Sequence, residues 1–203
     1  MIDVTVLDFG LGNLRSVSKA LERVGATVEV SEKVDPSADA LVVPGQGHFG
    51  SCVVNLGARI DDLRHWIDDG RLFLGICLGL QVLFDRSEES AEPGLGIFPG
   101  TVRRFDAPGL KVPHIGWNEV SPVLPAGGAL FDGIVPGTRF YFVHSYHPEP
   151  SDPTLVAATT DYGGEICCAV ERDNVFATQF HPEKSGDAGR DLLANFLKVC
   201  AAA

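Results

Sequence analysis

The sequence lacks the features that would direct it to nucleic acid or into a membrane. Its 203 residues contain 16 Lys and Arg against 27 Asp and Glu, a formal net charge of -11. Nucleic acids and anionic membrane surfaces attract an excess of basic residues instead. No basic segment precedes the first apolar run, and no apolar run approaches the roughly 20 residues that a membrane span needs. We therefore expect a cytoplasmic protein that binds neither nucleic acid nor a membrane.

Cysteine is scarce, and its spacing is irregular. The chain has five cysteines, none of them in a C-x-x-C pair, so the sequence predicts neither a disulfide framework nor a zinc site. Internal repeats, linkers and low-complexity segments are absent too. With 45% hydrophobic residues, the chain has enough apolar side chain for one sizeable core. We expect a single domain over residues 1–203 that holds no metal and no cofactor.

The first half of the chain alternates apolar strands with amphipathic helices. The second half contains short strands and ends with a helix. The expected strands of the first half are 2–10, 26–30, 39–45 and 71–76, and the expected helices are 13–25, about 55–69, and 78–85. The later strands are expected at 96–105, 139–146, 154–160, 165–172 and 174–180, with a helix at 187–200. This order predicts an α/β fold around one mixed sheet whose parallel part comes first.

One cysteine occupies a distinctive position. Cys77 lies in "LGICLGLQ", with Gly75 and Gly79 two residues away on either side, at a predicted strand-to-helix junction. Simple packing of a small thiol is the alternative, but it leaves the two glycines unexplained. A nucleophile on a sharp strand-to-helix turn needs small neighbours, as in the G-x-S-x-G elbow. A helix beginning at Leu78 would also favour the ionised thiol and supply free backbone N–H groups.

A cysteine nucleophile needs a histidine base and a third group that orients the ring. His-Pro-Glu occurs twice, at 147–149 and at 181–183. In an extended segment, residues i and i+2 share a face, so either glutamate can reach its histidine. His181 directly follows a predicted strand, where functional groups of α/β sheets gather, whereas His147 lies in a Pro-rich turn. We therefore predict a triad of Cys77, His181 and Glu183.

A glycine turn, "VVPGQGHFG", ends the third predicted strand in a similar place. Its backbone N–H groups at Gly45, Gln46 and Gly47 offer the second half of an oxyanion hole. An ordinary strand-end turn has the same composition, so the pattern alone leaves both interpretations open.

The segments "PGQG", "GICLGLQ" and "FHPEKS", in this order, resemble the class I (triad) glutamine amidotransferases. The resemblance implies a flavodoxin-like, three-layer domain with a central mixed, mostly parallel sheet. It also implies a glutaminase in which the Cys77 thiolate attacks the side-chain amide of glutamine, His181 protonates the departing ammonia, and Glu183 orients His181. His147 is then a bystander. Gln46 stands where the family more often has a small or β-branched apolar residue, which leaves the oxyanion donor undefined.

Three further segments, "DFGLGNLRSV", "HIGWN" and "YFVHSYH", resemble the glutaminase subunits of imidazole glycerol phosphate synthases. The resemblance implies a heterodimer with a (β/α)₈-barrel cyclase. That partner uses channelled ammonia to make imidazole glycerol phosphate and aminoimidazole carboxamide ribotide in histidine biosynthesis. The residues that it assigns to glutamine, besides the glycine turn, are Leu78, Gln81, His144, Ser145 and Tyr146. Those that it assigns to the cyclase are Asn13, Trp117 and Lys184.

Three other functions fit the residues. A glutaminase subunit of another amidotransferase would share the triad and differ in its partner. A stand-alone cysteine hydrolase of γ-glutamyl compounds would be fully active alone. A non-catalytic scaffold or redox sensor, in which Cys77 is merely oxidised, would never turn over glutamine. Glutamine hydrolysis measured with and without a cyclase distinguishes the four functions.

Overall fold

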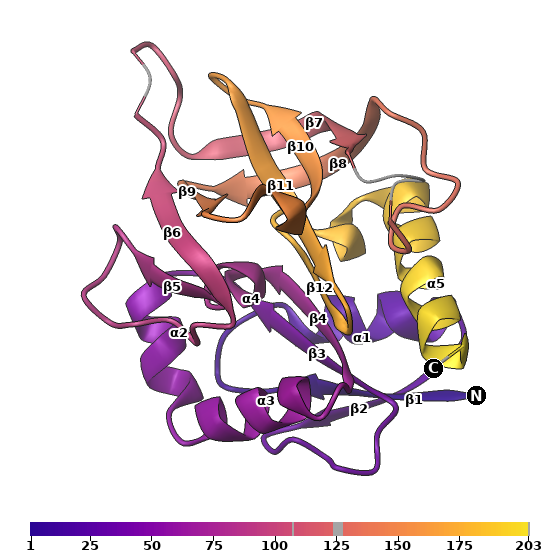
Figure 1. The fold of residues 1–203 in the computed structure, drawn as a ribbon. Coiled ribbons are helices and arrows are strands. Elements are labelled where there is room, and N and C mark those ends of the chain that lie inside the picture. The colour runs from indigo at the N-terminus through magenta and orange to yellow at the C-terminus, as the bar shows by residue number, and fades with distance from the viewer. Residues whose placement is uncertain (107, 124–127, 203) are drawn as a thin grey trace.

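A computed structural model describes residues 1–106, 108–123 and 128–202. Their main feature is a nine-stranded mixed sheet in the order β2-β1-β3-β4-β12-β11-β10-β7-β8 (Figure 1). The strands of its parallel half are β1 (Ile2–Leu7), β2 (Ala26–Ser31), β3 (Ala40–Gly45), β4 (Leu72–Cys77) and β12 (Val175–Thr178). The strands of the antiparallel half are β7 (His114–Pro122), β8 (Thr138–His144), β10 (Val156–Asp161) and β11 (Glu165–Arg172).

Helices cover both faces of the parallel half and make the fold a three-layer α/β structure. The helices are α1 (Leu14–Arg23), α2 (Phe49–Leu56), α3 (Arg59–Asp68), α4 (Leu78–Gln81) and α5 (Gly186–Ala202). The short 3₁₀ helices are η2 (Pro153–Leu155) and η3 (Pro182–Lys184). Figure 1 shows α2 and α3 on one side of the sheet and α1 with α5 on the other.

Alternation along the strands explains this arrangement, because successive strand residues point to opposite faces. In β3, Val42 belongs to the apolar cluster beneath α1 and α5, whereas Leu41 and Val43 belong to the cluster beneath α2 and α3. Every residue of β3 and β4 is buried. Strands covered on both faces read as continuous apolar runs, as these two do in the sequence. The predicted α/β class and its mixed central sheet are confirmed.

A second, three-stranded sheet lies beside the main one. It has the order β5-β6-β9 and consists of β5 (Phe84–Ser87), β6 (Phe98–Arg104) and β9 (Tyr146–Pro150). β9 begins two residues after β8 ends. The chain therefore passes from the main sheet to the small one at Ser145, above the carboxyl ends of the parallel strands.

Three local predictions were wrong. Most of the helix expected at about 55–69 is α3, but it begins later than expected, and α2 before it was not predicted; Gly57, with a φ of 50°, ends α2. The helix expected at 78–85 stops at Gln81, since Phe84 pairs with Phe98 as part of β5. The Pro-rich turn expected at 147–149 is strand β9, which pairs with β6. In the second and third cases, strand pairing with residues distant in sequence decided the local structure.

Some properties of the described residues bear on what the chain can bind. Within them, no helix combines the length and the apolar character required to cross a bilayer. All five cysteines are buried and free. In the same part of the chain, no three His, Cys, Asp or Glu side chains gather as a possible metal site.

Candidate active site

Three parallel strands of the sheet end side by side at one point. In the register of the sheet, Gly45 at the end of β3 is opposite Cys77 at the end of β4, and Ile76 is opposite Thr178 of β12. Carboxyl ends of parallel strands are where α/β folds place their functional groups. This edge therefore brings the glycine turn after β3, the cysteine after β4 and the histidine after β12 into one neighbourhood.

Cys77 forms a strained turn between β4 and α4. Its φ of 57° and ψ of -104° are unusual for a residue with a side chain, and such strain is typical of a nucleophile elbow. The glycines around it are required by close backbone contacts. A Cβ atom at Gly79 would collide with the Val43 carbonyl oxygen, and one at Gly75 would collide with the Gly79 carbonyl. The two glycines singled out in the sequence thus let β4 turn sharply into α4.

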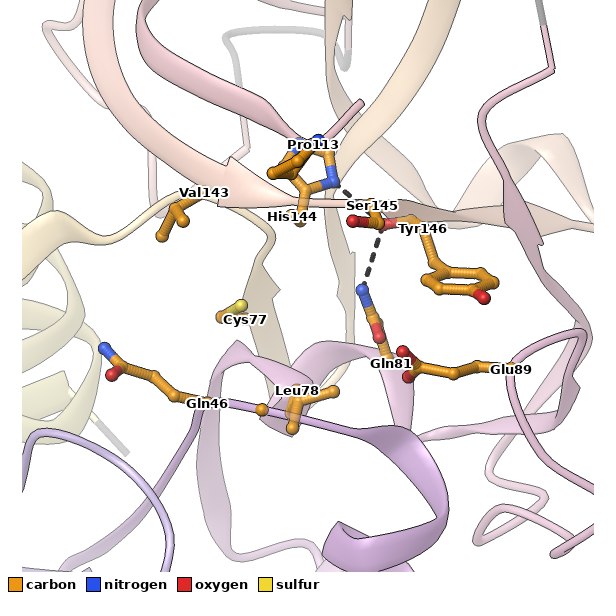
Figure 2. Close-up of a pocket in the computed structure, with 11 residues that line it drawn as sticks. Gln46, Cys77, Leu78, Gln81, Glu89, Pro113, Val143, His144, Ser145 and Tyr146 are labelled. Atoms are coloured by element: carbon orange, nitrogen blue, oxygen red, sulfur yellow. Dashed lines mark hydrogen bonds between the residues drawn. The ribbon is translucent and has the colours of Figure 1, made fainter. Parts of the chain in front are cut away.

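The turn after β3 packs directly against the elbow. A Cβ atom at Gly45 would lie 2.6 Å from Leu78 Cβ, so only glycine lets β3 approach α4 this closely. The next residue, Gln46, is half-buried, and its Nε2 atom is buried without a hydrogen-bond partner among the described residues. Figure 2 shows the Gln46 side chain extending away from Gln81 at the edge of the pocket. Gly47, with a φ of 111°, completes the turn.

His181 and Glu183 form a buried pair behind the elbow. His181 Nδ1 lies 2.8 Å from Glu183 Oε1, and both side chains are at most 2% exposed. The backbone fixes the ring, because the His181 N–H donates to the Tyr141 carbonyl and Ser185 Oγ donates to the His181 carbonyl. A carboxylate accepts hydrogen bonds, so Nδ1 carries the proton and Nε2 is the atom free for chemistry.

The charge of His181 is set by its neighbours. Burial alone lowers the pKa of His181, but favourable interactions with Cys77 and Glu183 outweigh burial and raise this pKa to about 9. Nε2 is buried and has no aligned hydrogen-bond partner among the described residues. A cysteine beside a protonated histidine is the arrangement that nucleophilic thiols use in general.

A cavity of about 350 Å³ opens above Cys77 (Figure 2). This volume lies in the usual range of small-molecule sites. Of the residues predicted to bind substrate, those that line it are Gln46, Gly47, Leu78, Gln81, His144, Ser145 and Tyr146. Gly45 is packed beneath Leu78 and does not line the cavity, and neither do His181 and Glu183. The substrate roles of these residues stay predictions.

Sequence reasoning missed three residues that line the cavity: Glu89, Pro113 and Val143. Glu89 matters most, because it brings a carboxylate to an otherwise largely uncharged pocket. Its Oε2 accepts a hydrogen bond of 2.7 Å from the Phe49 backbone N–H, which holds the side chain over the cavity. It stands in the acidic segment "DRSEES", whose composition indicates an exposed loop and gives no sign of a pocket.

Gln81 and His144 both bond to the Tyr146 backbone carbonyl. Gln81 Nε2 donates to it over 3.0 Å, and His144 Nδ1 donates over 2.8 Å, as the dashed lines in Figure 2 show. Burial lowers the pKa of His144 to about 3 and that of His114 to about 4, so both rings are neutral at pH 7. Since His144 Nδ1 is a donor, its Nε2 accepts from His114 Nδ1, 3.0 Å away. His144 thus has both ring nitrogens bonded within the protein.

The second His-Pro-Glu segment is outside this cavity. His147 does not line it, and its ring packs 5.0 Å from that of Phe105. Its Nδ1 donates weakly to the Pro148 carbonyl, and Glu149 pairs with Arg103 instead of His147. The fold joins histidine to glutamate in 181–183 and separates them in 147–149.

Of the three residues predicted to contact a partner, Trp117 is exposed, and Asn13 and Lys184 are half-buried. Trp117 on β7 is 55% exposed and lies beside Tyr141, whose ring is also 5.9 Å from Lys184 Nζ. Ile115, two residues before Trp117, is equally exposed. Asn13 begins α1, where its side chain accepts from the Ser16 N–H. Ile115 and Trp117 are two large apolar side chains exposed next to each other on one strand, a feature typical of interaction sites.

Comparison with known proteins places the whole chain in one family. Residues 5–200 match the family model described as "Glutamine amidotransferase class-I". Two curated relatives are both named "Imidazole glycerol phosphate synthase subunit HisH". The relative from Thermosynechococcus vestitus is 48% identical over 97% of this chain and 96% of its own length. The relative from Methanothermobacter thermautotrophicus is 48% identical over 98% of this chain and 100% of its own length.

Solved structures show the same fold at much lower identity. A structure titled "Structure of PurLQS from Thermotoga maritima" has a TM-score of 0.78 at 19% identity and covers 98% of both chains. The glutaminase domain of Trypanosoma brucei CTPS, solved with bound acivicin, has a TM-score of 0.70 at 17% identity, covering 100% of this chain and 94% of the other. Both likenesses support the fold and say nothing of the substrate.

Proposed function

The chain belongs to the class I glutamine amidotransferases, and on this premise we propose that it is the glutaminase subunit of an imidazole glycerol phosphate synthase. The observation that carries the proposal is the combination of the strained Cys77 elbow beneath a cavity with the buried His181–Glu183 pair behind it. The relatives that carry this subunit name match nearly the full length of the chain. One domain over residues 1–203 performs the reaction.

In the proposed reaction, the Cys77 thiolate attacks the carboxamide carbon of glutamine. The C–N bond then breaks, His181 gives its Nε2 proton to the leaving nitrogen, and ammonia departs from a γ-glutamyl thioester. Water, deprotonated by the now neutral His181, attacks the thioester and releases glutamate. Glu183 keeps Nδ1 protonated and stabilises the imidazolium, as the third member of a triad does.

The pocket has groups that suit both ends of the amino acid. The Glu89 carboxylate is the natural partner for the α-ammonium group, because its Oε1 atom is free of the bond that Oε2 makes to Phe49. Gln81 Oε1 adds an acceptor on the same side. Ser145 and Tyr146 supply polar groups for the α-carboxylate. A substrate held at both ends directs its side-chain amide toward Cys77, which is the positioning that such a reaction needs.

The oxyanion donors are proposed to come from the backbone around the elbow and the adjacent turn. Leu78 N–H and the turn at Gly45, Gln46 and Gly47 are the candidates. α4 has four residues, so its dipole adds little, and the individual N–H groups must carry this role. Gln46 Nε2, which has no hydrogen-bond partner within the part of the chain that the structure describes, is a polar group at this edge that a reorganised turn would satisfy.

The ammonia would be used by a second chain. We propose a (β/α)₈-barrel cyclase subunit, docked on the surface that includes Asn13, Trp117 and Lys184. Ammonia released into water at neutral pH becomes mostly ammonium, so a sealed route to the partner makes chemical sense. We also propose a cytoplasmic location, which five free thiols favour.

The test is a glutamine hydrolysis assay with the purified chain alone, with a cyclase subunit, and with the cyclase and its nucleotide substrate. We expect little turnover alone and strong stimulation in the complete mixture. Cys77→Ala should abolish turnover in all three samples. Full activity without the cyclase would favour a stand-alone γ-glutamyl hydrolase, and no turnover in any sample would favour the redox or scaffold function.

A further inference from the structure

Gln179 is a fully buried polar residue that the proposed mechanism does not use. It follows β12, two residues before His181, and none of its surface is exposed. Its backbone N–H donates to the Cys168 carbonyl over 2.8 Å, which fixes the main chain there. Its side chain lies between two residues of the active site. Nε2 is 3.6 Å from Cys77 Sγ, and Oε1 is 3.0 Å from Gln81 Nε2.

The orientation of this amide follows from its neighbours. The Tyr146 carbonyl can only accept, so the atom of Gln81 that faces it must be Nε2. The second hydrogen of Gln81 Nε2 then requires an acceptor, which is Gln179 Oε1. Gln179 is thereby left with its Nε2 directed at Cys77 Sγ. Reversing the amide would set two donors against each other at Gln81.

We propose that Gln179 is a further catalytic residue, which donates a hydrogen bond from Nε2 to the Cys77 thiolate and fixes the Gln81 amide so that its Oε1 faces the substrate. The role of Gln179 in glutamine turnover rests on the proposed function. The contact between Gln179 Nε2 and Cys77 Sγ does not depend on that function.

The properties of sulfur as an acceptor distinguish a catalytic role of Gln179 from a purely structural hydrogen bond of a buried amide. A neutral thiol is a weak acceptor, so a bond to it does little to offset the burial of an N–H group. A thiolate is a charged acceptor, and hydrogen bonds to charged groups are about twice as strong as neutral ones. The Gln179 donor therefore favours the ionised form of Cys77 over the neutral form.

The first experiment measures thiol reactivity without glutamine. Iodoacetamide alkylates Cys77 when the sulfur displaces iodide and forms an S–C bond, and peptide mass spectrometry quantifies the product. Cys77 lines the cavity, from which a small reagent can reach it, whereas burial raises the pKa of Cys52, Cys167 and Cys200 to about 12. In Gln179→Met the pH profile of Cys77 alkylation should move to higher pH. The rate at pH 7 should fall about tenfold, as expected when a hydrogen bond to a charged group is lost.

Two further variants separate the contacts of Gln179. Gln81→Met removes the substrate-side amide and the bond that orients Gln179, but leaves the Gln179 amide itself in place. The KM for glutamine should therefore rise, and alkylation should slow by less than the about tenfold expected for Gln179→Met. Gln179→Glu still accepts from Gln81 but sets an oxygen against the sulfur. It should slow alkylation more as the carboxyl ionises, and it supplies the result if Gln179→Met fails to fold.

The matched control is Asn195→Leu. Asn195 is also a buried amide, 4% exposed, and it donates to the carbonyls of Leu130 and Asp132 in the cluster beneath α5. Its loss should lower the Tm as much as Gln179→Met without moving the alkylation profile. The proposal is overturned if both Gln179 variants alkylate at the wild-type rate and pH, or if Asn195→Leu moves the profile equally. Glutamine turnover of the wild type tests the proposed function separately. The proposed function and the role of Gln179 can therefore be refuted independently.

Discussion

The tripeptide His-Pro-Glu occurs at residues 147–149 and at residues 181–183, and the fold puts the two copies in different surroundings. The first is part of β9, where Glu149 is exposed and paired with Arg103. The second begins η3, where Glu183 is buried and bonded to His181. In the first copy the histidine side chain bonds to the neighbouring Pro148 carbonyl, while the glutamate pairs with Arg103. Identical local sequences therefore give a surface strand in one place and a candidate catalytic pair in the other.

The two histidines also differ in charge. Burial lowers the pKa of His147, and the partly favourable contacts of Pro148 and Glu149 do not reverse this. Burial lowers the pKa of His181 as well, but Cys77 and Glu183 outweigh it and raise this pKa to about 9. The difference teaches that a carboxylate two residues away is not sufficient. The carboxylate must be shielded from water and directed at the ring, and tertiary structure decides both.

The largest expected effect comes from removing each histidine in turn. In the presence of a cyclase and its nucleotide, His181→Ala should lower kcat for glutamine by about 10³-fold, the usual loss for a general acid and base. His147→Ala should leave kcat within about threefold, since its ring packs on Phe105 outside the cavity. Steady-state assays on both variants check this. The reverse order of effects would move the triad to the first copy.

Replacing the glutamates should also lower kcat more in the second copy than in the first, but by a smaller factor than replacing the histidines. Glu183→Gln removes the charge that stabilises imidazolium at His181 but keeps a hydrogen-bonding group there, so we expect kcat to fall about 10²-fold. Glu149→Gln alters an exposed ion pair on the surface, and turnover should remain near that of the wild type. The pH dependence of kcat/KM provides the second readout, since Glu183→Gln should lower the apparent pKa assigned to His181. Equal losses in the two variants would contradict the comparison.

The sequence predicted those parts of the fold that depend on local periodicity. β1, β3, β4, α1 and α5 all have strong apolar patterns, and strand order placed His181 and Cys77 at one edge of the sheet. What it missed depends on distant partners. Residues 49–56 contain Gly and β-branched residues that disfavour helices, yet His48 caps α2 and Phe49 is buried beneath it.

The candidate site divides in the same way. Cys77 and Gln81 stand in a recognisable segment, whereas Glu89 reaches the cavity only because the Phe49 N–H, 40 residues away, holds its carboxylate. Gln179 gave one signal that could have been used, namely an amide next to Phe180 at the carboxyl end of the predicted strand "NVFATQF". A polar residue there requires partners, but Cys77, 102 residues away, could not be identified as one of them without the fold.

Stability as a function of pH should carry opposite signs for the two histidines. The pKa of His181 is raised from 6.5 to about 9, so its stabilising contribution is fully present below pH 6.5 and is lost as the pH rises through 9. Between pH 6 and 9 the wild type should therefore lose about 2 kcal/mol more free energy of unfolding than His181→Gln. The pKa of His147 is lowered, so the wild type should lose stability relative to His147→Gln as the pH falls below 6.5. Urea unfolding across this pH range measures both differences. Equal slopes for wild type and His181→Gln would show that the buried pair is not charged.

The smallest effect should follow from breaking the ion pairs of the first copy. Arg103 binds Glu149 and Glu88, and all three side chains are at least 41% exposed. Arg103→Ala should lower the Tm by no more than about 3 °C, because exposed ion pairs contribute little. The matched control is Arg190→Ala on α5, which also breaks two exposed pairs, with Asp187 and Asp191.

Glutamine turnover of Arg103→Ala gives the sharper result. Without Arg103, Glu149 is free to turn toward His147, so the variant gives the first copy its best opportunity to resemble the second. Turnover should nevertheless match that of Arg190→Ala, because β9 holds His147 opposite Arg103 on the small sheet and away from the Cys77 cavity. A tenfold change in turnover in Arg103→Ala alone would mean that the β9 segment communicates with the site. The two His-Pro-Glu copies would then both influence glutamine turnover and would differ only in the size of their effect.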